Sequence, residues 1–406
     1  MLSLARLCIV THMPRLTTSA FVAFAAFGAF WGVWGASVPR VQQQAGLSDG
    51  ELGLALLFVG AGALPAMLLV GRALDRWGLP VAAALIASLG VAAAGLALTA
   101  VDLVSLCAGL ALVGATSGAA DVAMNAVAGR AETLAGRPVI TRAHGVFSSL
   151  VVLGSLGTGL ASAASLPLAV PFVVVAVLSV AAGVALRRTL PVGVASPEPR
   201  RDAVATGRWR IGPFVLVGIL GALAFASENA HQSWSAVFAD DELHATGGLS
   251  AVAPAVFAAT VALTRFAAGG LGADRAGTVL LAGAVGAAAG AGLIAVAPTL
   301  VVAALGLALA AAGTAVLFPT LVGIVSRAVD ETHRGRATSI VTTVSYLGFL
   351  GGPVYVGLWS DAVGLRGAMV AVAALGVGLL VLAPPLLRLS GLSRLRPEQL
   401  DAAVGA

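Results

Sequence analysis

Long apolar stretches separated by short polar connections form the hydrophobic pattern of this 406-residue chain. Each stretch is close to the ~20 residues that a helix needs to cross the hydrocarbon layer of a membrane. A transmembrane barrel would instead show short segments of alternating hydrophobicity. The pattern therefore predicts an all-α integral membrane protein with twelve transmembrane helices, over residues 18–38, 51–71, 79–100, 103–130, 140–164, 167–186, 211–238, 249–270, 278–297, 300–326, 337–358 and 367–388.

The composition agrees with this pattern. Hydrophobic residues make up 59% of the chain and charged residues only 10%, and the mean hydropathy is +1.00. Soluble domains carry roughly a quarter charged residues, so a water-soluble fold could not cover this much apolar surface. The two cysteines, Cys8 and Cys107, are too few and too distant for a disulfide framework or a metal site.

The basic residues lie almost entirely in one set of connections. All 23 are arginines, and only Arg40 and Arg366 fall on the opposite side of the predicted map, while Arg265 lies within a helix. By the positive-inside rule, both termini face the cytoplasm and the chain is a multi-pass protein of the inner membrane. The net charge of +5 comes from arginines spread over many connections, so we expect no nucleic-acid partner.

A short motif occurs twice, 199 residues apart. Gly71, Asp75, Arg76 and Gly78 follow the second predicted span, and Gly270, Asp274, Arg275 and Gly277 follow the eighth. This spacing indicates two related halves. We divide the chain into a cytoplasmic N-terminal segment (1–17), a six-helix bundle (18–188), a cytoplasmic linker (189–210), a second six-helix bundle (211–388) and a cytoplasmic tail (389–406).

The repeated motif suits a conformational switch. Glycine permits a tight turn between helices, and aspartate can accept hydrogen bonds from a helix N-terminus or an arginine in one of two states. We group Arg130, after the fourth span, with these switch residues. The alternative is that glycine, aspartate and arginine simply make a stable short loop.

Asp121 and Asn125 lie four residues apart in the fourth predicted span and so share a helical face. A carboxylate at membrane depth is costly and needs a partner, a watery cavity or a functional task. Desolvation can hold it protonated until the cavity opens to water, which is the behaviour of a proton-coupling group. The alternative is a structural ion pair with Arg130 or Arg142.

A second polar group lies in the seventh predicted span. Glu228, His231, Gln232 and Ser235 recur at helical spacing, which predicts a polar stripe facing a cavity. Glu228, His231 and, in the fifth span, His144 are further candidates for proton coupling, because histidine titrates near neutral pH. Packing is the alternative role for either histidine.

Further residues are candidates for contact with a solute. Amide side chains can form hydrogen bonds with a polar solute, and indole rings can stack on the apolar face of the solute. The substrate-cavity candidates are Asn125, Asn229, Gln232, Trp234, Trp31 and Trp34. For the tryptophans, anchoring at the membrane interface or packing is an alternative. We expect Arg265 to pair with an acid or to extend toward the interface, and Gly351–Pro353 to form a hinge.

The duplicated motif and the six-plus-six layout resemble the major facilitator superfamily. This resemblance implies a monomer with two bundles that give alternating access to a central site. The spacing of Asp121 and Asn125 resembles the fourth helix of the fucose-permease-like branch, in which an acidic residue takes part in proton-coupled sugar uptake. The segments 142–148 and 228–237 resemble bacterial inner-membrane members of that branch.

The sequence therefore predicts a secondary transporter for a small solute, driven by the proton gradient and without a cofactor. It contains no motif of a metalloprotease, a serine hydrolase or a nucleotide-binding loop, so we expect no enzyme. Its partners are a small-molecule substrate and the lipid bilayer. One alternative is a proton-driven exporter of drugs or metabolites, and another is a membrane sensor that does not transport.

Overall fold

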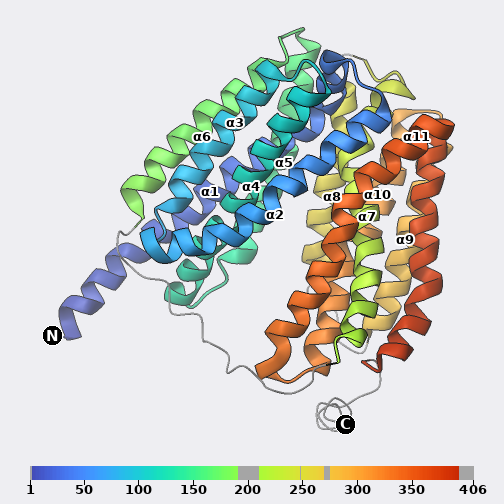
Figure 1. The fold of residues 1–406 in the computed structure, drawn as a ribbon. Helices are drawn as coiled ribbons and strands as arrows, with labels where there is room; N and C mark the ends of the chain where they lie inside the picture. The colour runs from blue at the N-terminus through green and yellow to red at the C-terminus, as the bar shows by residue number, and fades with distance from the viewer. Residues whose placement is uncertain (1, 191–209, 247, 269–274, 393–406) are drawn as a thin grey trace. The chain divides into compact units, whose positions relative to one another are not determined.

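The computed structural model describes residues 2–190, 210–246, 248–268 and 275–392, and within these ranges the regular structure is helical (Figure 1). Eleven described helices are long and apolar enough to cross a membrane. They are α1 (Leu2–Ala45), α2 (Asp49–Trp77), α3 (Val81–Thr99), α4 (Leu103–Ala135), α5 (Ile140–Ala163), α6 (Ala169–Thr189), α7 (Gly212–Asp241), α8 (Val252–Ala268), preceded by the 3-10 turn η1 (Leu249–Ala251), α9 (Ala276–Ala295), α10 (Leu300–Ala328) and α11 (Glu331–Ser390).

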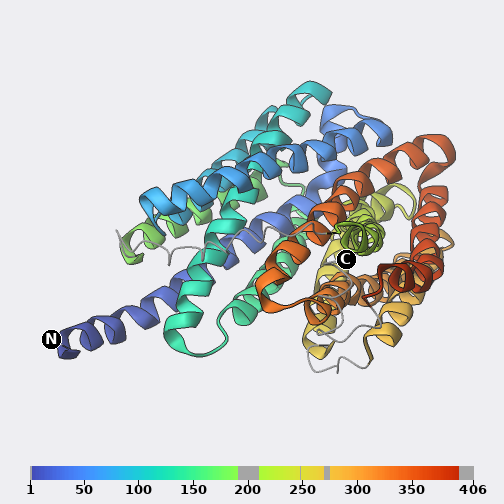
Figure 2. The ribbon, with the colours of Figure 1, turned by 60° about the horizontal axis from the view of Figure 1, so that its bottom comes forward.

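The helices form two compact units. Unit 1 contains α1 to α6 together with the segment Ala245–Ala255, and unit 2 contains α7, α8 from Val256 onward and α9 to α11. In unit 1, α1 packs on α5 and α3 packs on α6, as Figures 1 and 2 show. In unit 2, α7 and α9 both pack on α11. Each unit thus has its own core and is described separately below.

The last two predicted spans lie in α11, in which two helices meet at a kink. Its backbone leaves the helical conformation only at Gly364, where φ is 77° and ψ is 165°. Figure 1 shows the chain reversing direction within α11, from the orange to the red part. Only glycine adopts this combination of angles without steric cost, so a single residue replaces the loop that the sequence predicted between residues 358 and 367.

Some helices are longer than the predicted spans, because polar residues continue the helix beyond its apolar part. The second span does not end at residue 71, because α2 runs on to Trp77 and ends at Gly78, whose φ is 72°. The predicted N-terminal segment 1–17 lies almost entirely in α1. Hydropathy marks where a helix enters water, whereas the helix itself ends at a capping residue.

Polar caps define two helix starts on the predicted outer side. Ser48 and Glu51 form a capping box at the start of α2, and Asp102 and Ser105 form one at the start of α4. The hydrogen bond from the Ser105 backbone lowers the pKa of the Asp102 carboxyl below its ordinary value. These boxes supply acceptors to backbone N–H groups that have no partner within the helix.

Glycines allow α2 and α4 to approach closely. A Cβ atom added to Gly62 would meet the carbonyl oxygen of Ala111, and one added to Gly114 would meet the carbonyl oxygen of Val59. Lipid provides little hydrophobic force between helices, so such close backbone contacts supply much of the packing energy. The pairing of α2 with α4 therefore depends on the absence of these side chains.

Candidate functional site

Asp121 lies on α4 in unit 1 and is hydrogen-bonded to Asn125 of the same helix. The Asn125 side-chain amide donates to the Asp121 carboxylate at 3.2 Å and to the Asp121 backbone carbonyl at 2.9 Å. Neither Arg130 nor Arg142 forms an ion pair with it, because the ion pairs among the described residues join other groups. The structural ion pair that was the alternative interpretation is therefore absent from the described part of the chain.

His144 on α5 interacts electrostatically with Asp121. Its Nδ1 lies 3.0 Å from the Ile140 carbonyl oxygen, and its ring meets Phe24 of α1 edge-on with a centroid distance of 4.9 Å. The side chain is exposed. The structure thus brings together a carboxylate and an imidazole that lie in neighbouring helices of unit 1.

The tryptophans of α1 have different surroundings. Trp31 is partly exposed and meets Phe27 and Phe30 edge-on, whereas Trp34 is 5% exposed. Phe27 also contacts Phe147 of α5 at a centroid distance of 5.8 Å. Trp31 can contact a solute from unit 1. The Trp34 indole is packed in the protein, and its role as a cavity residue stays a prediction.

Glu228 on α7 forms an ion pair in unit 2. Its Oε1 accepts a hydrogen bond from Nη2 of Arg265 on α8 at 2.9 Å, and Nε of Arg265 donates to the Ala315 carbonyl oxygen of α10 at 3.4 Å. The Arg265 side chain is 49% exposed and the Glu228 side chain 13%. The pair is therefore neutral in sum, and about half of the arginine side-chain surface is open to a ligand.

The predicted polar stripe of α7 is divided between two environments. Gln232 is exposed, but His231 is 1% exposed and Ser235 5% exposed. His231 stacks on Phe257 of α8 and its Nδ1 lies 2.7 Å from the Ser227 carbonyl oxygen. His231 and Ser235 are thus buried, with Phe257 of α8 against the His231 ring, and their role at a cavity stays a prediction.

That buried side carries polar atoms without partners among the described residues. They are Ser227 Oγ, His231 Nε2 and Ser235 Oγ, which follow one another at intervals of four residues along α7. Unpaired buried polar groups are rare because each costs free energy unless water or a ligand satisfies it. A row of water molecules along this face would satisfy all of them.

Asn229 and Trp234 connect α7 to α11. The Asn229 amide donates to the Phe349 carbonyl oxygen at 2.6 Å, and the Trp234 indole N–H donates to the Pro353 carbonyl oxygen at 3.2 Å. Both side chains are buried. Each satisfies a backbone carbonyl near a proline, and their role as cavity residues stays a prediction.

An aromatic cluster of unit 2 was not predicted from the sequence. Phe225 of α7 lies 4.2 Å from Phe318 of α10, centroid to centroid, and 5.7 Å from Tyr346 of α11. Phe349 completes the cluster, 5.8 Å from Tyr346. The cluster lies near Glu228, because Phe225 and Glu228 are three residues apart on α7. The sequence offered no signal, because each aromatic residue alone resembles an ordinary apolar position of a span.

The first copy of the repeated motif ends α2. Gly71 lies inside the helix, Gly78 closes it, and Asp75 and Arg76 precede Trp77, whose ring lies 5.5 Å from the Arg76 guanidinium carbon. In the second copy, Arg275 and Gly277 begin α9, while Gly270 and Asp274 lie outside the described residues. Arg130 lies in the last turns of α4. The proposed switching role of these residues stays a prediction.

The two arginines on the predicted outer side bind within their own units. Arg40 Nη2 donates to the Leu166 carbonyl oxygen at 2.9 Å in unit 1. In unit 2, Arg366 pairs with Glu242 at 2.9 Å and donates to the carbonyl oxygens of Ala295 and Ala297. Both arginines on the predicted outer side therefore bind carbonyl oxygens near helix ends, and Arg366 also binds a carboxylate.

A set of membrane-length helices, a few of which carry ionisable side chains within their spans, is typical of one class of protein, the polytopic helical membrane transporter. A sequence profile described as Major Facilitator Superfamily matches residues 19–308 and 217–403. An uncharacterized transporter of Sinorhizobium fredii, y4wD, is 30% identical over 358 residues, which cover 86% of this chain and 92% of the relative. The chain belongs to the major facilitator superfamily and is a multi-pass inner-membrane transporter, not an enzyme.

Solved structures share the fold. The nucleoside transporter NupG aligns with a TM-score of 0.70 at 13% identity, over 95% of this chain and 99% of its own. A D-xylose-proton symporter aligns with a TM-score of 0.67 at 16% identity, over 95% of this chain and 98% of its own. At these identities the likeness concerns the fold alone.

Proposed function

We propose that this protein is a proton-coupled secondary transporter that moves a sugar-like or other polar solute across the inner membrane by alternating access. The observation that carries the proposal is a difference between two carboxylates within the spans. Glu228 is paired with Arg265 at 2.9 Å, whereas Asp121 has an amide partner and no ion pair among the described residues. Asp121 is thereby the candidate for the coupling group.

The difference matters because of the cost of charge inside a membrane. A guanidinium beside a carboxylate stabilises the charged form of the carboxylate, since the pair is neutral in sum. A carboxylate that is hydrogen-bonded to an amide and interacts electrostatically with a histidine, but has no ion pair, is stabilised less in its charged form when water is absent. Its protonation can therefore follow the opening and closing of the surrounding cavity, which is the requirement for coupling.

Unit 2 suggests the solute class. On α7, Phe225 belongs to an aromatic cluster and Glu228 and Gln232 supply hydrogen-bonding groups, while the half-exposed Arg265 adds a cation. Sugars and related polyols offer an apolar ring face for stacking and hydroxyl groups for charged partners. The names of the structural neighbours, a nucleoside transporter and a D-xylose-proton symporter, support a solute of this kind.

The test begins with a screen for the solute. Purified protein is heated with pentoses, hexoses, polyols, nucleosides, amino acids and cationic drugs, and a rise in melting temperature identifies binders. A binder is then used for uptake into proteoliposomes with an imposed proton gradient. A panel in which drugs bind and no sugar, polyol or nucleoside does would overturn the proposed solute class.

The coupling step is tested with Asp121→Asn. We expect this variant to lose at least about tenfold of its uphill accumulation while it still exchanges labelled for unlabelled solute across the membrane, because exchange needs no net proton movement. Asp102→Asn is the matched control, since it makes the same change at the exposed start of the same helix, where asparagine also caps. Wild-type accumulation by Asp121→Asn would refute the coupling role.

Export of an aromatic drug or metabolite is the second candidate, and the Phe225 cluster favours it. The structure of unit 2 suits an aromatic solute as well as a sugar ring. Flux in oriented membrane vesicles separates the two, because an exporter accumulates solute only in inside-out vesicles with a proton gradient. Solute binding without flux in either orientation would instead favour the sensor.

A further inference from the structure

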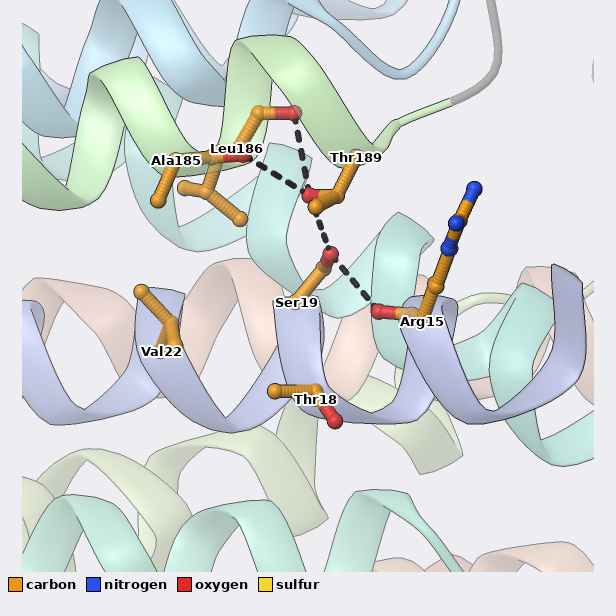
Figure 3. Close-up of a pocket in the computed structure, with 7 residues that line it drawn as sticks. All are labelled: Arg15, Thr18, Ser19, Val22, Ala185, Leu186 and Thr189. Atoms are coloured by element: carbon orange, nitrogen blue, oxygen red, sulfur yellow. Dashed lines mark hydrogen bonds between the residues drawn. The ribbon is translucent and has the colours of Figure 1, made fainter.

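A pocket opens between α1 and α6 in unit 1, at the ends of these helices that carry arginines. It has a volume of about 270 Å³ and is lined by Arg15, Thr18 and Ser19 at one end and by apolar residues that include Val22, Ala185 and Leu186 (Figure 3). This is below the size of pockets that enclose a drug-sized ligand. It has room for a small polar group whose remainder lies outside.

The polar end of the pocket has a cation without an acidic partner. Ser19 Oγ donates to the Arg15 carbonyl oxygen at 2.8 Å and lies 2.8 Å from Thr189 Oγ1, which itself donates to the Ala185 carbonyl oxygen, so these hydroxyl groups are satisfied. The Arg15 guanidinium forms no ion pair with any acid in the described part of the chain. The positive charge at this end of the pocket therefore suits an anionic ligand.

More positive charge lies beside the pocket. Arg187 and Arg188 occupy the last turn of α6, both are exposed, and neither has an ion-pair partner among the described residues. No lining residue is acidic. By the one-sided distribution of arginines, this corner faces the cytoplasmic leaflet, where anionic lipid headgroups attract clustered arginines.

The apolar end of the pocket continues along α6. Ala185, Ala181, Leu178 and Val174 recur at helical spacing, and all of them are exposed, Leu178 and Val174 at 55% and 52%. Such a stripe faces lipid and offers a path for an acyl chain that starts in the pocket. A free phosphate ion would use the polar end alone and leave this path without a role.

We infer that the pocket between α1 and α6 binds an anionic phospholipid of the cytoplasmic leaflet, with the phosphate at Arg15 and an acyl chain along the exposed face of α6. The site has no part in solute coupling, so the inference stands independently of the proposed function. Bound lipid would hold the first and last helices of unit 1 together at this end, in addition to the hydrogen bond between Ser19 and Thr189.

The experiment compares dioleoyl phosphatidylglycerol with dioleoyl phosphatidylcholine. Purified full-length protein is titrated with each lipid, and retained lipid is counted by native mass spectrometry together with the shift in melting temperature. We expect phosphatidylglycerol to be retained in preference, and Arg15→Gln to bind it about fivefold more weakly, since one arginine near an anionic headgroup contributes about that factor. Arg15→Lys should keep most of the affinity.

Two further variants separate a pocket from general surface charge. Ala185→Phe fills the pocket from an exposed position and keeps every charge, so it should weaken binding as much as Arg15→Gln does. Arg388→Gln removes an exposed arginine from the last turn of α11, outside the pocket. This variant should bind phosphatidylglycerol as the wild type does. Each variant is first checked for the wild-type melting temperature without lipid.

Specific results would overturn the inference. Unchanged binding by Ala185→Phe would mean that the pocket is empty, and equal losses in Arg15→Gln and Arg388→Gln would mean delocalised attraction. Glycerol phosphate is added as a competitor without acyl chains. Competition at the concentration at which the lipid binds would assign the site to a free phosphate compound instead.

Discussion

At the scale of single residues, Pro353 explains the burial of one polar side chain of α7, that of Asn229. Proline has no N–H, so the carbonyl of Phe349, four residues earlier in α11, lacks its usual partner within the helix. Asn229 supplies the missing donor at 2.6 Å. Trp234 donates to the carbonyl of Pro353 itself. The segment that the sequence suggested as a hinge is therefore held to α7 by hydrogen bonds on both sides of the proline.

This arrangement predicts a coupling between two substitutions. Asn229→Ala should lower the free energy of unfolding by about 1 kcal/mol, as expected for a hydrogen bond between membrane helices. In a Pro353→Ala background the new backbone N–H can bond to Phe349, so Asn229→Ala should there cost almost nothing. Unfolding titrations in mixed micelles measure both, with the exposed Gln232→Ala as a control. Equal costs in the two backgrounds would contradict the explanation.

Sequence reasoning found the ionisable residues of the spans but few of their contacts. Asp121 and Asn125 are on the same helix, so their bond follows from spacing alone. Glu228 and Arg265 are 37 residues apart, and nothing in either segment identifies the other as its partner. The aromatic cluster draws on three helices, α7, α10 and α11, and phenylalanine in an apolar span carries no sign of its neighbours. Long-range pairing needs the tertiary fold.

At the scale of elements, small residues decide how closely helices pack. Gly114 of α4 faces the backbone of α2 at Val59, and no side chain larger than hydrogen fits there. Hydropathy correctly predicted the existence of these helices, because apolar length is a local property. It also predicted a connection between residues 358 and 367, where α11 reverses at Gly364, but it could not predict the end of α2, which Gly78 sets through backbone geometry.

The close contact between α2 and α4 predicts that a glycine-to-alanine substitution changes the stability differently at a packed position and at an open position. Gly114→Ala should destabilise the protein by about 1–3 kcal/mol, because the added methyl group meets a carbonyl oxygen that cannot move without shifting a helix. Gly95→Ala in α3 meets no atom within 4 Å and should be neutral or stabilising by up to about 1 kcal/mol. Thermal unfolding of both variants checks this, and equal effects would contradict the packing argument.

At the scale of the whole molecule, the distribution of charge predicts the orientation in the membrane. Arginines gather at one set of helix ends, and the two on the other side are bound within the protein. Two helical units agree with the 199-residue repeat, although the ionisable residues within the spans do not repeat: the shift places Thr320 opposite Asp121 and Ala29 opposite Glu228. The scaffold is duplicated, whereas the polar groups are specific to each unit.

The predicted orientation is tested by labelling single cysteines. After replacement of Cys8 and Cys107 by serine, Thr246→Cys should react with a membrane-impermeant maleimide in intact cells, because its position lies in an outer connection. Arg137→Cys, exposed in the connection between α4 and α5, should react only after the membrane is permeabilised. The reverse pattern would place both termini outside.

The use of Arg40 and Arg366 within the protein has an electrostatic consequence for the outer surface. These are the only basic residues predicted on that side, and Arg366 already neutralises Glu242. The remaining outer carboxylates, among them Asp49, Glu51 and Asp102, give this surface a negative potential that extends about a Debye length, ~8 Å, into the solution. Hydronium and other cations are enriched in that layer and anions are depleted, so a neutral or cationic solute arrives from outside more readily than an anionic one.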